Sequence, residues 1–268
     1  HFRPHHLLKG QWLKRWLLPL ALWFKILRIR PKILIISTHE LIFCALACKA
    51  FLGCKIIYDV QENYVLNLTG IDPNFIKHIY AKWVRFKEII SRPFIDTYWL
   101  AEQCYQAQLP FAKGKNVVVE NKAYFVPIAT ETSPSFDLIF TGTISEYAGI
   151  KKAINFFLDL LEIRPESRLK IIGQYHDRRI KKYLEKNASQ YDSIHLNISP
   201  SPIPHEEILA AIKEARLGII SYKPSDVNSQ KIPTKLYEYS RYNLPYLVEQ
   251  KSYWDEIGGE LGGAIPID

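Results

Sequence analysis

The residues from Lys231 to Pro245 read KIPTKLYEYSRYNLP and lie between two apolar runs, LGIIS at Leu217–Ser221 and LPYLV at Leu244–Val248. Short apolar runs of this kind predict buried strands, and Thr234 to about Arg241 has the spacing of a helix. A helix that connects two such strands predicts a parallel sheet covered on both faces. This stretch therefore favours an α/β fold.

The same alternation of strand and helix continues along most of the chain. Short apolar runs predict further strands at 32–37, 55–58, 97–100, 116–119, 137–141, 169–172 and 195–198. Helical spacing predicts helices at 6–30, 41–52, 75–92, 150–162, 177–187 and 205–215. Residues 123–136 lack periodicity and are rich in Pro, Ser and Thr, which predicts a linker. We expect one domain at 1–123, a linker at 124–136 and a second domain at 137–268, with two doubly wound sheets facing a cleft.

Three strand exits in the second half point to one ligand site. Gly142 and Thr143 follow one strand, Gly173 and Gln174 follow the next, and Tyr222 follows the strand before the helix that begins near Thr234. Ligands of parallel sheets bind beyond the carboxyl ends of strands. Small residues at such an exit let the backbone approach a phosphate or a sugar. We expect these residues to line the cleft.

The helix that begins near Thr234 carries the strongest chemical signal. Thr234 is a plausible N-cap after Pro233, so the first turn offers unpaired N–H groups and a positive dipole end to an anion. Lys235 adds a mobile positive charge, and the Glu238 carboxylate is placed to accept two hydrogen bonds from a vicinal diol such as a ribose. Together they predict a nucleoside diphosphate site. The alternative is that Lys235 and Glu238 form an i, i+3 pair on the surface.

Polar residues also follow the strands of the first half. Glu62, Glu102 and Asn121 stand at strand exits and are candidates for contact with a substrate. Glu62 is in addition a candidate catalytic carboxylate. The alternative for Glu62 is a structural role at the Asn63 turn, where a helix begins.

The positive charge is concentrated in the first half of the chain. The net charge is +8, and residues 1–130 contain 18 Lys and Arg against 8 Asp and Glu, whereas the remainder contains 17 against 19. The first 32 residues hold eight of these cations and no acid, interleaved with tryptophans and leucines. This basic N-terminal region predicts contact with an anionic membrane surface. No helix-turn-helix or zinc-finger motif accompanies the charge, so nucleic acid is not expected as a partner.

Three further features concern the location of the protein and its need for a metal. The longest uncharged run of that region, 16–24, is far shorter than the roughly 20 residues that cross a bilayer, so no membrane span is expected. The four cysteines form no CxxC pair, which favours free thiols in a reducing cytoplasm. No Asp-x-Asp pair occurs, so a metal ion that holds a diphosphate has no obvious ligand set in this sequence. No cofactor is expected. The expected location is the cytoplasm, at the inner face of the membrane.

Several of these segments resemble glycosyltransferase family 4. The resemblance is carried by PTKLYEYSRYNLPYLV, LIFTGTISEYAG, LKIIG and KIIYDVQENY. It implies the GT-B fold of two Rossmann-like domains that face a cleft, here incomplete at both ends. It also implies a retaining, metal-independent hexosyltransferase of polysaccharide biosynthesis that moves a sugar from a UDP- or GDP-sugar to a saccharide or lipid-linked acceptor.

The resemblance also assigns roles to individual residues. It implies that Glu238 binds the ribose hydroxyls, that Lys235 faces the diphosphate, and that Gly142 and Thr143 lie against the donor. The sequence departs from the family at three places. This chain has Ala148–Gly149 where the family has Lys-Gly, and Ser229–Gln230 near the place of an upstream glutamate. It has Gln61 where the family has a histidine on the acceptor side. These departures leave a second hypothesis open, a catalytically silent protein that binds nucleotide sugars on the same fold.

Overall fold

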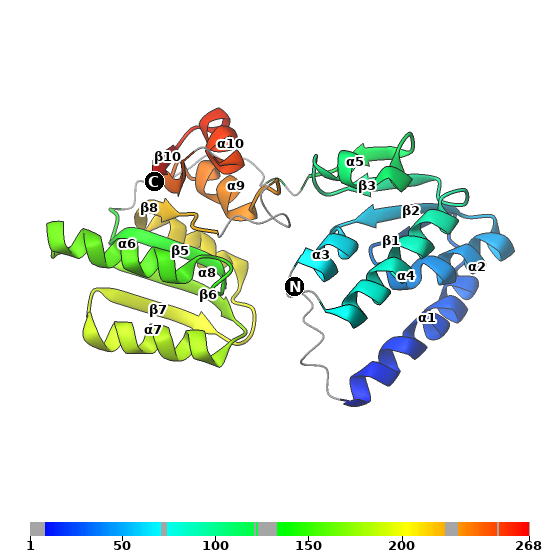
Figure 1. Cartoon of the computed structure of the whole chain (residues 1–268), viewed down its shortest axis with the longest axis horizontal. Coiled ribbons are helices and arrows are strands. Elements are labelled where there is room, and N and C mark those ends of the chain that lie inside the picture. The colour runs from blue at the N-terminus through cyan, green and yellow to red at the C-terminus, as the bar shows by residue number, and fades with distance from the viewer. Residues whose placement is uncertain are drawn as a thin grey trace. The chain divides into compact units, whose positions relative to one another are not determined.

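The chain divides into two compact units, His1–Asn121 and Lys122–Asp268 (Figure 1). The computed structural model describes residues 9–70, 74–120, 122, 133–222, 230–250 and 252–267. Residues 1–8 of the basic N-terminal region, Asn121, and most of the expected linker lie outside this part of the chain. No helix within the described residues has the length and apolar character needed to cross a bilayer.

The first unit is built on a parallel four-stranded sheet in the order β1-β2-β3-β4. Its strands are β1 (Ile33–Ile36), β2 (Lys55–Val60), β3 (Thr97–Leu100) and β4 (Asn116–Val118). The helices are α1 (Lys9–Ile29), α2 (Ile42–Leu52), α3 (Tyr64–Gly70), α4 (Phe75–Ser91) and α5 (Tyr105–Gln108), with short 3-10 turns at His39–Leu41 and Pro110–Ala112. Alternate residues of β2 and β3 are fully buried against the helices and form the core of the unit.

The second unit contains a parallel six-stranded sheet in the order β10-β9-β8-β5-β6-β7. Its strands are β5 (Phe136–Ile144), β6 (Leu169–Tyr175), β7 (Ile194–Ser199), β8 (Ala215–Ile219), β9 (Tyr246–Glu249) and β10 (Ala264–Ile267). The helices are α6 (Ile150–Ile163), α7 (Arg178–Gln190), α8 (His205–Lys213), α9 (Thr234–Arg241) and α10 (Tyr253–Leu261). Two separate apolar clusters contain the buried side chains of this sheet and its helices.

The order of strands in the second unit reverses beside β5. The chain proceeds from β5 to β6 and β7 on one side, and then crosses to β8, β9 and β10 on the other side. A reversal of this kind leaves a crevice at the carboxyl ends of the two central strands, where parallel sheets bind ligands. The fold therefore places the candidate site at the carboxyl ends of β5 and β8.

The α/β class and all nine strands expected from the sequence are confirmed, but several details were wrong. β5 and β6 each extend three residues further than expected, so Gly142 and Gly173 lie inside paired strands and not in loops. Pro233, not Thr234, is the N-cap of α9, and no side chain caps this helix. The expected linker reaches one residue into β5, because Phe136 already belongs to that strand. The elements α3, α5, α10 and β10 were not expected.

Candidate functional site

Two glycines face each other where β5 and β6 pair. Gly142 and Gly173 are opposite each other in the parallel ladder, with φ angles of +91° and +156°. A Cβ atom on Gly173 would lie 1.8 Å from the carbonyl oxygen of Gly142, so no other residue fits there. A Cβ on Gly142 would approach the Cε atom of Lys235 at 4.0 Å. Gly142 therefore lies beside the Lys235 side chain, and Gly173 is its partner in the ladder.

Lys235 is buried, and its ammonium group lies against aromatic rings. The residue is 4% exposed, and its Nζ atom has no hydrogen-bond partner among the described residues. The Nζ atom lies 4.3 Å from the ring centre of Phe140 and 4.9 Å from that of Tyr222. These ring faces stabilise a cation only in part. Burial lowers the pKa of Lys235 to about 7, against the opposing charge of Glu238.

Glu238 lies one turn further along α9 and remains partly accessible. Its side chain is 16% exposed, and its Oε1 atom lies 3.8 Å from Nε2 of His205, the first residue of α8. Burial raises the pKa of Glu238, whereas the nearby His205, Lys235 and Arg241 lower it. The expectation of an exposed Lys235–Glu238 pair is wrong, and so is the expectation of a mobile Lys235, because the lysine is enclosed. Instead, α9 presents a buried cation and a half-buried carboxylate in consecutive turns.

The walls of the site are held by contacts between loops that are distant in sequence. Gly149, with φ of +78°, packs against the backbone of Ser221, and the Ser221 hydroxyl donates to the Gly149 carbonyl at 3.0 Å. This contact fixes Tyr222, whose ring lies 6.4 Å from Tyr147 and 5.6 Å from Trp254. The Trp254 indole N–H in turn donates to the Lys231 carbonyl at 2.7 Å. The segment before α9 is therefore held by the Trp254–Lys231 hydrogen bond, and Trp254 also contacts the Tyr222 ring.

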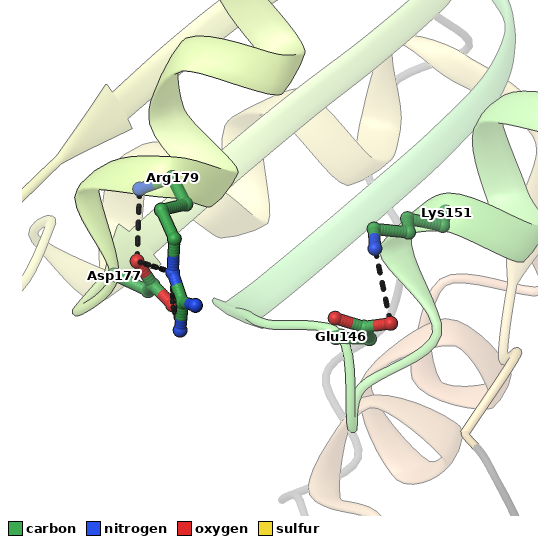
Figure 2. Close-up of polar contacts among 4 residues, drawn as sticks. All are labelled: Glu146, Lys151, Asp177 and Arg179. Atoms are coloured by element: carbon green, nitrogen blue, oxygen red, sulfur yellow. Dashed lines mark hydrogen bonds and ion pairs between the residues drawn. The ribbon is translucent and has the colours of Figure 1, made fainter.

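Two ion pairs on the surface join the segments after β5 and β6 to the first turns of α6 and α7. Lys151 Nζ lies 3.0 Å from Glu146, and Arg179 Nη2 lies 2.8 Å from Asp177, the N-cap of α7 (Figure 2). Both pairs are exposed, so their contribution to stability is small. Lys151 is already neutralised by Glu146, which leaves Lys235 as the better candidate for binding an anion at this edge of the sheet.

Thr143 and Gln174 follow the two glycines at the ends of β5 and β6. Gln174 donates from Nε2 to the Pro200 carbonyl at 2.9 Å, so its side chain orients the loop after β7. The structure thus brings together Gly142, Gly173, Tyr222, Lys235 and Glu238, with Thr143 and Gln174 at the rim.

The candidate residues of the first half belong to the other unit. Gln61 donates to Asp59 at 2.6 Å, and Glu62 accepts from the Asn67 amide at 2.8 Å. The capping role at this turn belongs to Asn63, whose side chain accepts from the Leu66 N–H. Glu102 follows β3 after Ala101, whereas Asn121 lies outside the described residues. Gln61 and Glu62 thus follow the carboxyl end of β2, as the sequence predicts.

Sequence reasoning missed three contributors to the site. His205 and Phe140 lie within a predicted helix and a predicted strand, and the local sequence pattern does not mark either of them as part of a ligand site. Tyr147 lies in a loop and has no periodic signal. Their contacts depend on which strands become neighbours, which no local pattern specifies. Within the described residues, no cluster of three or more His, Cys, Asp or Glu side chains has the geometry of a metal site.

Solved structures share this fold at low sequence identity. The chain is similar to sucrose-phosphate synthase from Thermosynechococcus elongatus, with a TM-score of 0.66 and 10% identity over 93% of this chain and 64% of that one. It is also similar to HepE from Anabaena in complex with UDP, with a TM-score of 0.60 and 12% identity over 87% of this chain and 63% of that one. A third is the UDP-forming α,α-trehalose-phosphate synthase from Burkholderia vietnamiensis, with a TM-score of 0.65 and 11% identity over 98% and 66% of the two chains.

These similarities define the class of fold. The chain has the two parallel-sheet units of the GT-B glycosyltransferase fold, as the sequence predicts. It spans less than two thirds of the length of the first two solved structures. No protein-family model matches the sequence, and no curated protein matches it.

Proposed function

We propose that this protein is a glycosyltransferase that uses a nucleoside diphosphate sugar, a UDP- or GDP-sugar, as donor. The observation that carries the proposal is the Lys235 ammonium, buried without a hydrogen-bond partner among the described residues, at the carboxyl ends of a parallel sheet. A buried cation without a partner is costly, and an anionic ligand removes that cost. A diphosphate supplies this charge, and Glu238 is within one turn to accept hydrogen bonds from the ribose hydroxyls.

The chemistry of the transfer requires little beyond this arrangement. When the bond between the anomeric carbon and phosphate breaks, positive charge develops on the sugar and negative charge on the leaving diphosphate. Lys235 stabilises that leaving group, Gly142 and Gly173 let the donor approach the backbone, and Tyr222 closes one side. In a retaining reaction of the family 4 type, the departing diphosphate also accepts the proton of the acceptor hydroxyl. We assign Gln61, Glu62, Glu102 and Asn121 to the saccharide or lipid-linked acceptor, with Glu62 as a catalytic carboxylate.

We further propose that the reaction needs no metal ion and no cofactor. The sequence contains no Asp-x-Asp pair, and Lys235 together with the N-terminal N–H groups of α9 supplies positive charge for the diphosphate. If this is right, chelation by EDTA leaves nucleotide binding and transfer unchanged.

Isothermal titration with UDP and GDP tests the proposal. We expect wild-type protein to bind one of them, and Glu238→Ala to weaken binding about a hundredfold or more, because two charge-assisted hydrogen bonds of about 1.5–3 kcal/mol each are lost. Lys235→Ala should weaken binding by a similar factor. Two exposed residues of the same unit serve as controls, Lys151→Ala and Glu206→Ala, and should bind as the wild type does. Absence of binding by the wild-type protein to either nucleotide overturns the proposal.

One observation favours the second candidate, a catalytically silent protein that binds nucleotide sugars. Ala148, which stands where the resembled family has a lysine, is buried in the core of the second unit. No cation from that loop position reaches a donor. Slow hydrolysis of a UDP- or GDP-sugar by the purified protein, lost in Lys235→Ala, decides for the enzyme. Tight binding without any hydrolysis or transfer decides for the silent protein.

We also propose that the protein works in polysaccharide biosynthesis at the cytoplasmic membrane face, through its basic N-terminal region. The eight cations and absent acids of the first 32 residues support this location. Retention on anionic vesicles that falls with salt, without retention on DNA, is the expected result. Retention on DNA alone contradicts it.

A further inference from the structure

The helix α4 (Phe75–Ser91) buries two charged side chains and exposes several large apolar ones, unlike an ordinary surface helix. Its charged residues Lys87 and Glu88 are buried, with Glu88 only 2% exposed. Its opposite side exposes an apolar stripe in which Phe75 and Ile76 are 79% and 77% exposed. We call this stripe the α4 face, and it consists of Phe75, Ile76, Ile79, Trp83, Phe86 and Ile90. A water-facing helix normally turns its polar side outward.

The buried charges hold α4 in this rotation. Lys87 Nζ lies 2.9 Å from Nδ1 of His39 and 3.3 Å from the His39 carbonyl oxygen. The Glu88 carboxylate lies 3.4 Å from Arg85 Nη1. Turning the helix to bury its aromatic side chains would break the contacts of Lys87 with His39, whereas the Arg85–Glu88 pair lies within α4 and would turn with it. The exposure of the α4 face is therefore a fixed property of the first unit.

The apolar surface continues onto the neighbouring helix. The Trp83 ring is stacked on Phe86 at 5.6 Å and lies 6.2 Å from Phe43 of α2, which is itself exposed. Figure 1 shows α1, α2 and α4 side by side, and contacts between α1 and α2 and between α2 and α4 agree with this view. Soluble proteins rarely leave a contiguous apolar surface of this kind without a partner.

The charge around this surface indicates the kind of partner. The only acidic residue of α1, α2 and α4 is the buried Glu88, whereas Lys25, Arg28 and Lys82 are exposed on these helices. A hollow of about 690 Å³ where α1 and α2 end is lined by Arg30, Lys32 and Lys55 beside the exposed Phe51. Two copies of this chain joined through the face would bring like charges together. An anionic surface complements both the apolar stripe and the cations.

We propose that the α4 face docks on a bilayer that contains anionic phospholipid. The aromatic and aliphatic side chains of the face enter the headgroup boundary, the exposed lysines contact lipid phosphates, and the hollow between Arg30 and Lys55 receives a headgroup phosphate. This interaction uses residues outside the candidate donor site and goes beyond the proposed function. The docking surface shares Arg30 and Lys32 with the basic N-terminal region and rests on the membrane contact proposed for that region, to which it adds the α4 face.

Vesicle flotation of the full chain tests the proposal. The substituted residues are exposed, so we expect the variants to fold as the wild type does. We expect binding to vesicles of phosphatidylcholine with phosphatidylglycerol, and weak binding to phosphatidylcholine alone. Ile76→Ser should weaken the partition coefficient by about tenfold, since it removes one large apolar side chain from the boundary. The matched control is Ile163→Ser, a residue of α6 in the second unit with 80% exposure. Lys82→Gln should reduce binding to the anionic vesicles about fivefold, because each lysine near such a surface contributes about 1 kcal/mol.

The possible results distinguish a lipid bilayer from a second copy of the chain as the partner of the α4 face. Equal vesicle binding by wild type, Ile76→Ser and Ile163→Ser overturns the proposal and leaves any membrane contact to other residues. A lipid-free dimer in light scattering that Ile76→Ser converts to monomer, without vesicle binding, shows a second copy on the face and also overturns it. Nucleotide titration of Ile76→Ser should match the wild type, so a failure here is distinguishable from a failure of the donor site.

Discussion

At the scale of residues, the central feature is the conflict between burial and charge at Lys235. Its ammonium group lies against two aromatic rings, with Gly142 beside the side chain and no hydrogen-bond acceptor within reach among the described residues. Ring faces offset only a part of the lost hydration. A residue that serves the fold alone would be better replaced by an apolar one of the same shape. We therefore propose that a ligand with negative charge pairs with this lysine.

The first prediction is that Lys235→Met stabilises the free protein. Methionine has a similar length and loses no hydration of a charge, so the free energy of unfolding should rise by about 1–4 kcal/mol. Denaturation with urea in the absence of nucleotide measures this difference. Lys151→Met, which alters an exposed lysine, should change stability by less than about 0.5 kcal/mol. A clear loss of stability in Lys235→Met would show that the lysine supports the fold and not a ligand.

The second prediction concerns pH. In the folded protein, burial lowers the pKa of Lys235 from 10.5 to about 7. The negative charge of Glu238 acts in the opposite direction and raises this pKa, but by less. Between these two values the unfolded chain binds the proton more tightly, so the free energy of unfolding rises with pH through this window. The stability gap between Lys235→Met and wild type should be widest below pH 7 and should shrink toward about pH 10.

The same titration affects nucleotide binding. At about pH 8 Lys235 is mostly neutral in the free protein, and a bound diphosphate restores its charge. We expect uptake of up to about one proton per nucleotide, measured by calorimetry in buffers of different ionisation enthalpy. His205 near Glu238 is a second source of protons, so Lys235→Met is the necessary comparison. Equal uptake in wild type and in this variant contradicts the assignment.

At the scale of elements, the site depends on how closely β5 and β6 approach. Gly173 allows this approach, because any side chain there would meet the Gly142 carbonyl oxygen at 1.8 Å. We predict that Gly173→Ala lowers the free energy of unfolding by about 1–3 kcal/mol, the usual cost of overpacking, and weakens nucleotide binding by displacing Gly142.

Gly259 in α10 provides a matched control for this substitution. An added Cβ there meets no atom within 4 Å, so Gly259→Ala should stabilise the protein by about 0.5–1 kcal/mol. Thermal denaturation of both variants measures the contrast. If Gly173→Ala has no effect on stability or on binding, the close approach of the two strands is not required.

Particular elements show what could be predicted from the sequence. The apolar run at Thr97–Leu100 and the helix at Thr234–Arg241 have the predicted bounds, because their patterns end at polar residues. The helix α10 was missed because Gly258 and Gly259 interrupt its spacing, although Ser252 caps it through the Asp255 N–H. The carboxyl ends of β5 and β6 were missed for a related reason, since glycine normally ends a strand.

The candidate site was predictable in part only. Lys235, Glu238 and Gly142 follow from helix and strand position, and the structure brings them together. Their environment does not follow, because a lysine at the start of a short helix is ordinarily exposed. The enclosure by Phe140 and Tyr222, and the approach of His205, result from the order in which β5, β6 and β8 pair. That order is a tertiary property, and local spacing carries no information about it.

At the scale of the whole molecule, the two units have separate cores and separate candidate roles. Tyr58 and Tyr98 are buried in the first unit, whereas Phe140 and Tyr239 belong to the two clusters of the second. The candidate donor residues all come from the second unit, and the candidate acceptor residues come from the first. We propose this division of donor and acceptor residues between the two units. The four cysteines all lie in the first unit and are free.

The most direct test of the central claim is a structure of the protein with UDP or GDP bound. We predict that the Lys235 Nζ atom lies about 3 Å from a diphosphate oxygen, and that the Glu238 carboxylate accepts hydrogen bonds from the ribose hydroxyls. A nucleotide bound elsewhere, with Lys235 still enclosed between Phe140 and Tyr222 and without a partner, would contradict the account.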